Sequence, residues 1–253
     1  MLSDLRHAVR MLVKSRSFTL AAWLTLALGI GANTAIFSLI NTTFLRALPY
    51  PDPDSLVRVA ERRPAIGETI PVSYPNFLDW QRRQDAFSAL AIYQGQTMKL
   101  RTAQGAELVS VRHVSAQFFD LFGARPVLGR AMRPEDDAVG AERVAWIADD
   151  AWRRLFGGDP GLVGRSLVLD GRSVVVAGIL PEGFRFYRGA DLTMAIAPFA
   201  RELFLDMRQN RSNCEVLGRL KSGVAIATAQ AHMDVIARRL ADEYPQANAG
   251  IQV

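Results

Sequence analysis

The chain has 253 residues, of which 49% are hydrophobic and 22% charged, a composition typical of a globular protein and not of a disordered one. Its formal charge of +5 lies mainly near the N-terminus, because residues 49–253 hold 25 basic against 24 acidic side chains. That near-neutral part lacks the electrostatic footprint of a nucleic-acid-binding protein. The single cysteine, Cys214, excludes an intrachain disulfide and a thiolate metal cluster.

Residues 1–17 predict a short basic amphipathic helix that lies on the inner surface of a membrane. Leucine and valine recur there at helical spacing, and Arg6, Arg10 and Lys14 lie on other faces. Two interpretations stay open, since the basic side suits anionic membrane lipid as well as a cytoplasmic partner protein.

Residues 18–40 form a run of 23 residues without a charge, and apolar character continues to residue 48. As a helix the run would be about 35 Å long, more than the roughly 30 Å of a bilayer's hydrocarbon core. A cleaved signal peptide has a shorter apolar region, of about 7–15 residues. We therefore predict a transmembrane helix and its exit over residues 18–48. Because four basic residues precede the run, we expect the N-terminus in the cytoplasm and the rest of the chain outside.

Small and polar residues interrupt the apolar run at Gly29, Gly31, Asn33 and Thr34. Small residues let helices approach closely, and an amide in hydrocarbon is costly unless it finds a partner. These four residues are candidates for a face that packs against further membrane helices or against a second copy of the chain.

A stiff linker rich in proline and aspartate leads into a domain over residues 49–253, in which strands and helices are interspersed. The pattern shows no strict βαβ rhythm and favours the α+β class. The expected elements are a strand over 56–61, a helix from Ser73 to about Gln84, strands over 92–101 and 107–114, a short helix over 116–122, and a long amphipathic helix over 226–240 that ends before Pro245.

The clearest local signal is a hairpin over residues 166–180. Asp170 and Gly171 stand between two runs rich in β-branched residues. Such a pair favours a two-residue loop in which both residues have positive φ.

No set of residues for catalysis or for a metal stands out. His7, His113 and His232 are scattered and fit core or surface positions, and the acidic run at residues 135–137 more simply begins a helical turn than binds a cation. The serines lack a nucleophile-elbow context, and no glycine-rich phosphate loop follows a strand. We therefore expect a protein that is not an enzyme and that holds no cofactor or metal.

Five segments in a fixed order carry a family resemblance. They are residues 28–57, which begin LGIGANTAIF, residues 73–80, SYPNFLDW, and residues 118–137, 151–186 and 218–245. The first resembles the first membrane helix and exit of MacB-like ABC transporter permeases, in particular the bacterial group without an adjacent ATPase gene. The other four resemble the MacB-like periplasmic core domain.

The resemblance implies a permease of the bacterial inner membrane with four membrane helices, the last three in an FtsX-like segment, and with the core domain in the periplasm between the first two. It implies a porter-like subdomain over about residues 56–120 and 218–253, with an inserted subdomain over about residues 121–217. ATP would be bound by a separate cytoplasmic ATPase that moves the helices. The chain ends at Val253 before a second apolar run, which leaves two interpretations: part of a longer permease, or a true single-span form.

The leading functional hypothesis is therefore the N-terminal part of an ABC-type permease, whose outer domain couples helix motion to export or to a periplasmic partner. The alternative is a single-span anchored module that binds or scaffolds an extracytoplasmic partner without transport. A reading frame that continues into three more apolar spans would favour the first hypothesis.

Overall fold

The structure is a computed structural model that describes residues 16–40, 50–102, 105–184, 186, 189–211 and 213–253. It divides into two compact units, residues 1–49 and residues 50–253.

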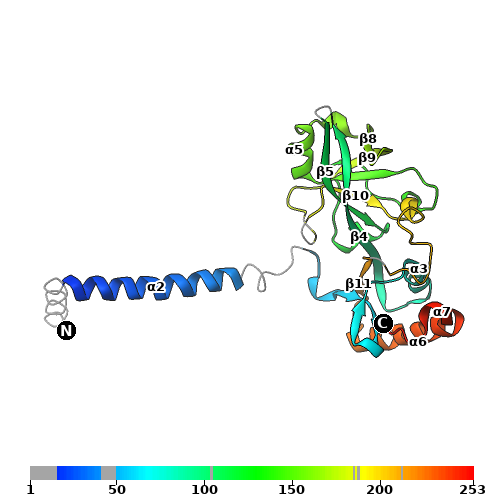
Figure 1. The fold of residues 1–253 in the computed structure, drawn as a ribbon, viewed down its shortest axis with the longest axis horizontal. Coiled ribbons are helices and arrows are strands. Elements are labelled where there is room, and N and C mark those ends of the chain that lie inside the picture. Colours follow the sequence, from blue (N-terminus) through cyan, green and yellow to red (C-terminus); the bar gives the residue numbers. More distant parts are fainter. Residues whose placement is uncertain (1–15, 41–49, 103–104, 185, 187–188, 212) are drawn as a thin grey trace. The chain divides into compact units, whose positions relative to one another are not determined.

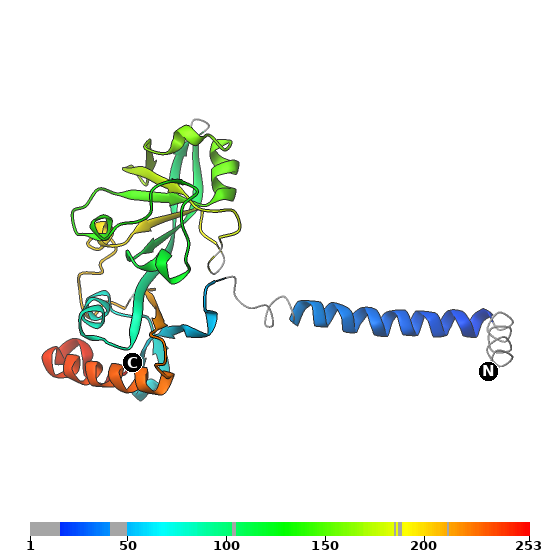
Figure 2. The ribbon, with the colours of Figure 1, turned by 180° about the vertical axis from the view of Figure 1, so that it is seen from behind.

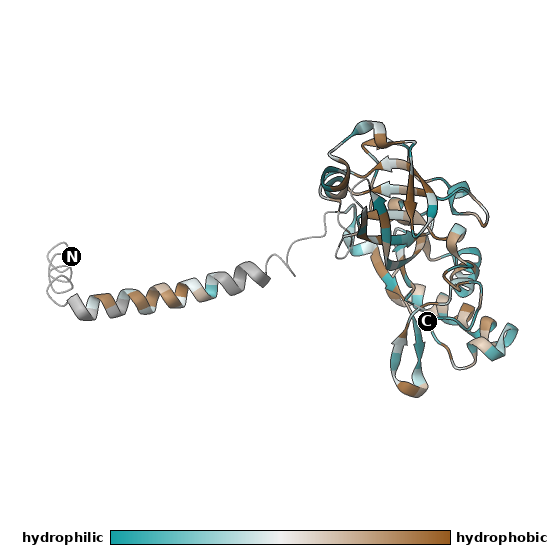
Figure 3. Cartoon of the chain, turned by 45° about the horizontal axis from the view of Figure 1, so that its top comes forward, coloured by the Kyte–Doolittle hydropathy of each residue, from teal (hydrophilic) through white to brown (hydrophobic). Residues whose placement is uncertain are grey.

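The described part of the first unit is one helix, α2 (Arg16–Ile40). Side chains from residue 23 to residue 34 are exposed, and hydrophobic residues predominate along this stretch (Figure 3). Counting the described residues alone, no helix meets the length and hydropathy that a membrane crossing requires. Residues 1–15 of the predicted amphipathic helix and residues 41–48 of the predicted exit lie outside the described part of the chain.

The second unit is built on a mixed sheet of nine strands. Its strands are β1 (Leu56–Val59), β4 (Phe87–Thr102), β5 (Gly105–Val114), β6 (Leu128–Gly129), β7 (Val144–Ile147), β8 (Ser166–Leu169), β9 (Arg172–Ile179), β10 (Leu192–Ala195) and β11 (Glu215–Leu220). They follow the order β1-β11-β4-β5-β10-β7-β9-β6, and β8 pairs with both β4 and β9. The β5–β10 and β7–β9 pairs are parallel, and β2 (Glu61–Arg63) forms a separate ribbon with β3 (Glu68–Ile70). This mixture of strands and helices agrees with the predicted fold class.

The 16-residue strand β4 connects the two ends of the unit. Its first half pairs with β11 and its second half with β5. Figures 1 and 2 show this strand running from the end that holds α6 (Ile226–Glu243) and α7 (Pro245–Asn248) to the end that holds α5 (Asp149–Phe156).

Three hydrophobic clusters pack along the sheet. The first joins residues of the region 57–92 to residues of the region 196–253, around Phe77, Trp80 and Met233. The second lies around Leu100 and Ile147, and the third gathers the rings near α4 (Phe118–Leu121). The first cluster draws on both ends of the domain; the predicted division into a porter-like and an inserted subdomain stays a prediction.

Helices α3 (Tyr74–Arg83) and α6 cover the first cluster. The chain enters α3 after Ser73, as predicted, with a proline in the first turn and Phe77 and Trp80 buried. Helix α6, predicted over 226–240, buries Ala229, Met233, Ile236, Ala237 and Leu240. Their 3,4 spacing forms the inner face of the helix, whereas Ile226 at its start is exposed.

Predicted boundaries differ from the structure most clearly in three elements. The strand predicted over 92–101 begins five residues earlier, since β4 starts at Phe87. The strand predicted over 56–61 is interrupted at Ala60, because β1 pairs with β11 while β2 turns away to pair with β3. The short helix predicted over 116–122 contracts to α4 and is followed by Gly123, whose φ is 62°.

Candidate functional site

Residues 50–55 open the second unit, and one arginine fixes this leading segment to the sheet. Arg219 on β11 donates from Nη1 to the carbonyl oxygen of Asp52 (2.8 Å) and to Ser55 Oγ (2.6 Å). Its Nη2 donates to the carbonyl oxygen of Leu121, at the end of α4. A single guanidinium therefore joins the leading segment, α4 and β11.

Close packing supports the same segment. The ring of Tyr50 lies 4.6 Å from that of Phe122, between centroids, and packs against the third cluster. A Cβ at Gly123 would lie only 3.0 Å from Pro51 Cγ. The absence of a side chain at Gly123 thus lets the leading segment lie against the end of α4.

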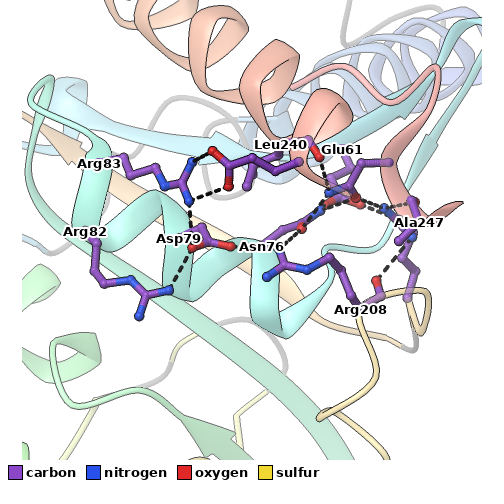
Figure 4. A network of polar contacts seen from close by, with 11 residues as sticks. Glu61, Asn76, Asp79, Arg82, Arg83, Arg208, Leu240 and Ala247 are labelled. Carbon is purple, nitrogen blue, oxygen red and sulfur yellow. Dashed lines mark hydrogen bonds and ion pairs between the residues drawn. The ribbon is translucent and has the colours of Figure 1, made fainter. Parts of the chain in front are cut away.

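A buried polar network, which we call the joint, connects segments far apart in the sequence (Figure 4). The joint consists of Glu61, Asn76, Asp79, Arg208, Arg211 and Asn248. Glu61 on β2 is fully buried, and its carboxylate accepts from Arg211 Nε and, at 2.6 Å, from Asn76 Nδ2. Arg211 also donates to the carbonyl oxygen of Ala247 (3.0 Å) and to Asn248 Oδ1 (2.9 Å). These bonds compensate the buried charge of Glu61.

Asp79 anchors the other side of the joint. Its carboxylate forms three ion pairs, at 2.7 Å from Arg82 Nη2, 2.7 Å from Arg208 Nη1 and 3.4 Å from Arg83 Nη2. Burial acts to raise the pKa of Asp79, but the hydrogen bonds from Arg82 and Arg208 and the positive charges of Arg208 and Arg83 together outweigh it and lower the pKa. The guanidinium of Arg208 also stacks 3.7 Å from the ring centroid of Tyr244. Asp79 is therefore held ionised between α3 and the loop before β11.

The joint stands where the first strands of the unit meet its last residues. Arg62 on β2 and Gln252 form an antiparallel bridge, with Arg62 N–H donating to the Gln252 carbonyl (2.8 Å) and Gln252 N–H to the Arg62 carbonyl (2.9 Å). Val253 packs against the first cluster. The last residues of the unit are thus bonded to β2 and packed on the first cluster.

Two ionisable groups, one fully buried and one half-buried, lie near the ends of β5 and β10. His113 is fully buried, its ring nitrogens have no hydrogen-bond partner, and burial lowers its pKa to about 4. Asp137 accepts from the N–H groups of Ala116 (3.0 Å) and Ala197 (2.8 Å), and burial raises its pKa to about 6. The same desolvation therefore shifts the two pKa values in opposite directions.

The predicted packing residues lie on α2. Gly29, Gly31, Asn33 and Thr34 are all exposed, and a Cβ at either glycine would meet no atom within 4 Å. No described residue covers them, and their role in helix packing stays a prediction. Asp170 (φ 46°) and Gly171 (φ 79°) form the two-residue loop between β8 and β9.

The acidic run at residues 135–137, considered for metal binding, has another partner. Among the described residues, no group of three His, Cys, Asp or Glu side chains is placed to hold a metal ion. The acidic run forms the short 3-10 helix Pro134–Asp137, in which Asp136 accepts from Arg130 at 2.6 and 2.7 Å. Cys214 is buried, and burial raises the pKa of its thiol to about 12.

Comparison with known families and structures gives the same fold. The family model described as MacB-like periplasmic core domain matches residues 19–236. No curated protein matches the chain. The periplasmic region of MacB from Actinobacillus actinomycetemcomitans has 12% identity and a TM-score of 0.54, over 72% of this chain and 78% of that one.

Two further solved structures are similar. The extracellular domain of the noncanonic ABC-type transporter YknZ from Gram-positive bacteria has 15% identity and a TM-score of 0.55, over 72% of this chain and 89% of that one. A domain of a protein described as a permease, from Porphyromonas gingivalis, has 16% identity and a TM-score of 0.60, over 80% of this chain and 89% of that one. At these identities the structures show the fold, whereas the family match spans most of the sequence. The chain therefore belongs to the MacB-like periplasmic core domain family.

Proposed function

We propose that this protein is the N-terminal part of an ABC-type permease, and that its second unit is an extracytoplasmic domain driven by the motion of a membrane helix. The family match supports the class. The charge-free run at residues 18–40 and the basic residues before it support an anchor in the bacterial inner membrane with a cytoplasmic N-terminus.

The partners in this proposal are a separate cytoplasmic ATPase, which supplies the energy, and further permease helices or a second copy of the chain. The exposed face at Gly29, Gly31, Asn33 and Thr34 is where those helices would pack. The domain passes the motion on, either to an exported substrate or to a periplasmic partner.

The fixed leading segment is the observation that carries this proposal. Motion of a helix reaches a domain only if the chain between them does not swing as a free tether. Here Arg219 joins residues 50–55 to β11, which pairs with β1 and β4. A force on the leading segment is thereby passed to the strand that runs along both of the first two clusters.

Hydrogen exchange in the full chain, reconstituted in lipid nanodiscs, tests whether Arg219 holds the leading segment against the sheet. The N–H groups of Ser55 and Leu56 donate to the carbonyls of Asp52 and Pro53 within this segment. Loss of a charged hydrogen-bond donor costs about 1.5–3 kcal/mol, so Arg219→Gln should speed exchange at both amides by about ten- to a hundredfold.

The matched control is Arg125→Gln, since Arg125 lies near α4 but its side chain is 72% exposed and its carboxylate partner is 3.6 Å away. The control should leave both amides protected. If the amides of Ser55 and Leu56 are already unprotected in the parent protein, or if Arg219→Gln does not change their exchange rates, the leading segment is a free tether. That result would favour the alternative of an anchored binding module without coupling.

A further inference from the structure

A small cavity of about 10 Å³ lies beside the joint. Its lining includes Glu61, Asn76, Trp80 and Asn248. Asn76 and Trp80 are four residues apart on α3, so both side chains leave the helix on the same face. Ala237 and Leu240 also line the cavity, so it is bounded by α3, β2, α6 and α7.

Trp80, which lines this cavity, has an indole N–H group without an acceptor. Its side chain is fully buried, and its Nε1 has no hydrogen-bond partner in the structure. Buried N–H groups without a partner are rare in folded proteins because they lose their bond to water without replacement. The other two tryptophans of the second unit do have acceptors. Trp146 Nε1 on β7 donates to the Arg130 carbonyl (2.7 Å), and Trp152 Nε1 on α5 donates to the Asp159 carbonyl (2.9 Å).

We infer that the cavity binds one water molecule, which accepts a hydrogen bond from Trp80 Nε1 and donates to a joint oxygen. A cavity needs roughly 10–15 Å³ of space open to the centre of a water-sized sphere to hold one water. The space of about 10 Å³ here therefore admits a single water and nothing larger.

Glu61 Oε1 is the acceptor with capacity to spare. It accepts one hydrogen bond, from Asn76 Nδ2 at 2.6 Å, and a carboxylate oxygen can accept two. By contrast, Asn248 Oδ1 already accepts from both Asn76 and Arg211. The water then links α3 to β2 and satisfies the one buried donor of the cavity that the side chains leave unmet.

Water contacts of the indole N–H groups test this site in the full chain, labelled with ¹⁵N-tryptophan in detergent micelles. A bound water gives a rotating-frame Overhauser cross-peak at the water frequency, opposite in sign to a cross-peak from proton exchange. We expect this cross-peak at Trp80 Nε1–H and none at Trp146 Nε1–H, which is buried but bonded to a carbonyl. Trp146 is thus the internal control for burial without water.

The Trp80→Phe variant assigns the Trp80 resonance. If that variant fails to fold, Trp23→Phe, Trp146→Phe and Trp152→Phe assign it by elimination, because the chain has four tryptophans. A Trp80 indole without a dipolar water contact, or one whose water contact is no stronger than that of Trp146, would overturn the inference and leave the cavity dry.

Discussion

The opposite pKa shifts of His113 and Asp137 predict a pH dependence of stability that is partly hidden in the parent protein. The folded-state pKa of His113 is about 4, below its ordinary 6.5. The unfolded chain therefore binds more protons, and stability falls as the pH drops from 6.5 towards 4. Between pH 7 and pH 5 this group alone lowers the free energy of unfolding by about 2 kcal/mol.

Asp137 acts in the reverse direction. Its folded-state pKa of about 6 lies above the ordinary 3.8. The folded chain binds more protons in this case, so the contribution to stability is present at low pH and is lost as the pH rises through 6. Between pH 7 and pH 5 this group raises the free energy of unfolding by about 1 kcal/mol, which offsets much of the loss from His113.

Single substitutions should separate the two contributions. His113→Leu removes no hydrogen bond, because neither ring nitrogen has a partner. Relative to the parent, this variant should gain about 2 kcal/mol of stability on going from pH 7 to pH 5. Asp137→Asn should lose about 1 kcal/mol over the same interval.

Thermal unfolding of the full chain in detergent at pH 7, 6 and 5 measures these changes. For a protein of this size, 1 kcal/mol corresponds to a change in Tm of about 2–4 °C. All other titrating groups are shared, so they cancel when each variant is compared with the parent. The reasoning is refuted if both variants follow the parent's pH dependence, or if the two differences have the same sign.

Three further predictions concern the loop, the helix and the joint. Gly171→Val should lower the stability of the domain by about 1 kcal/mol or more, because a β-branched residue is strained at positive φ, and an unchanged Tm would contradict this. Combining Gly29→Leu with Gly31→Leu should abolish the periodic crosslinks between single cysteines placed along α2 in a cysteine-free background, while membrane insertion persists; equal crosslinking would show that this face does not pack. Arg211→Met should cost about 3–5 kcal/mol of stability, because its buried carboxylate partner loses its counter-charge. The same change at Arg125, which is 72% exposed and pairs with an exposed carboxylate, should cost less than about 1 kcal/mol, and equal losses would argue against the joint.

The sequence predicted those elements whose cause is local. Ser73 and the proline after it mark the start of α3, and the 3,4 spacing of apolar residues marks α6. Strands β7 and β10 carried no such signal, because each has four residues and all are buried. A strand buried on both faces shows no polar alternation, so the pattern that identifies a half-buried strand is missing.

The contacts of the joint and of the leading segment were not predictable in this way. Glu61 and Arg211 are 150 residues apart, and Arg219 and Asp52 are 167 residues apart. Each pair forms because the sheet places β11 next to β1. The sequence shows charged residues at these positions, but their partners depend on a strand order that no local pattern specifies.

Labelling of single cysteines from outside the cell tests the central claim most directly. In a Cys214→Ala background, one cysteine replaces Asp242, which is exposed on α6, and another replaces Ser3 near the N-terminus. A membrane-impermeant maleimide is applied to intact spheroplasts and to opened membranes. An extracytoplasmic domain on an anchor with a cytoplasmic N-terminus predicts that Asp242→Cys reacts in intact spheroplasts and that Ser3→Cys reacts only after the membranes are opened, with both chains in the membrane fraction. Reaction of Ser3→Cys but not Asp242→Cys in intact spheroplasts, or recovery of the chain outside the membrane fraction, would contradict the account.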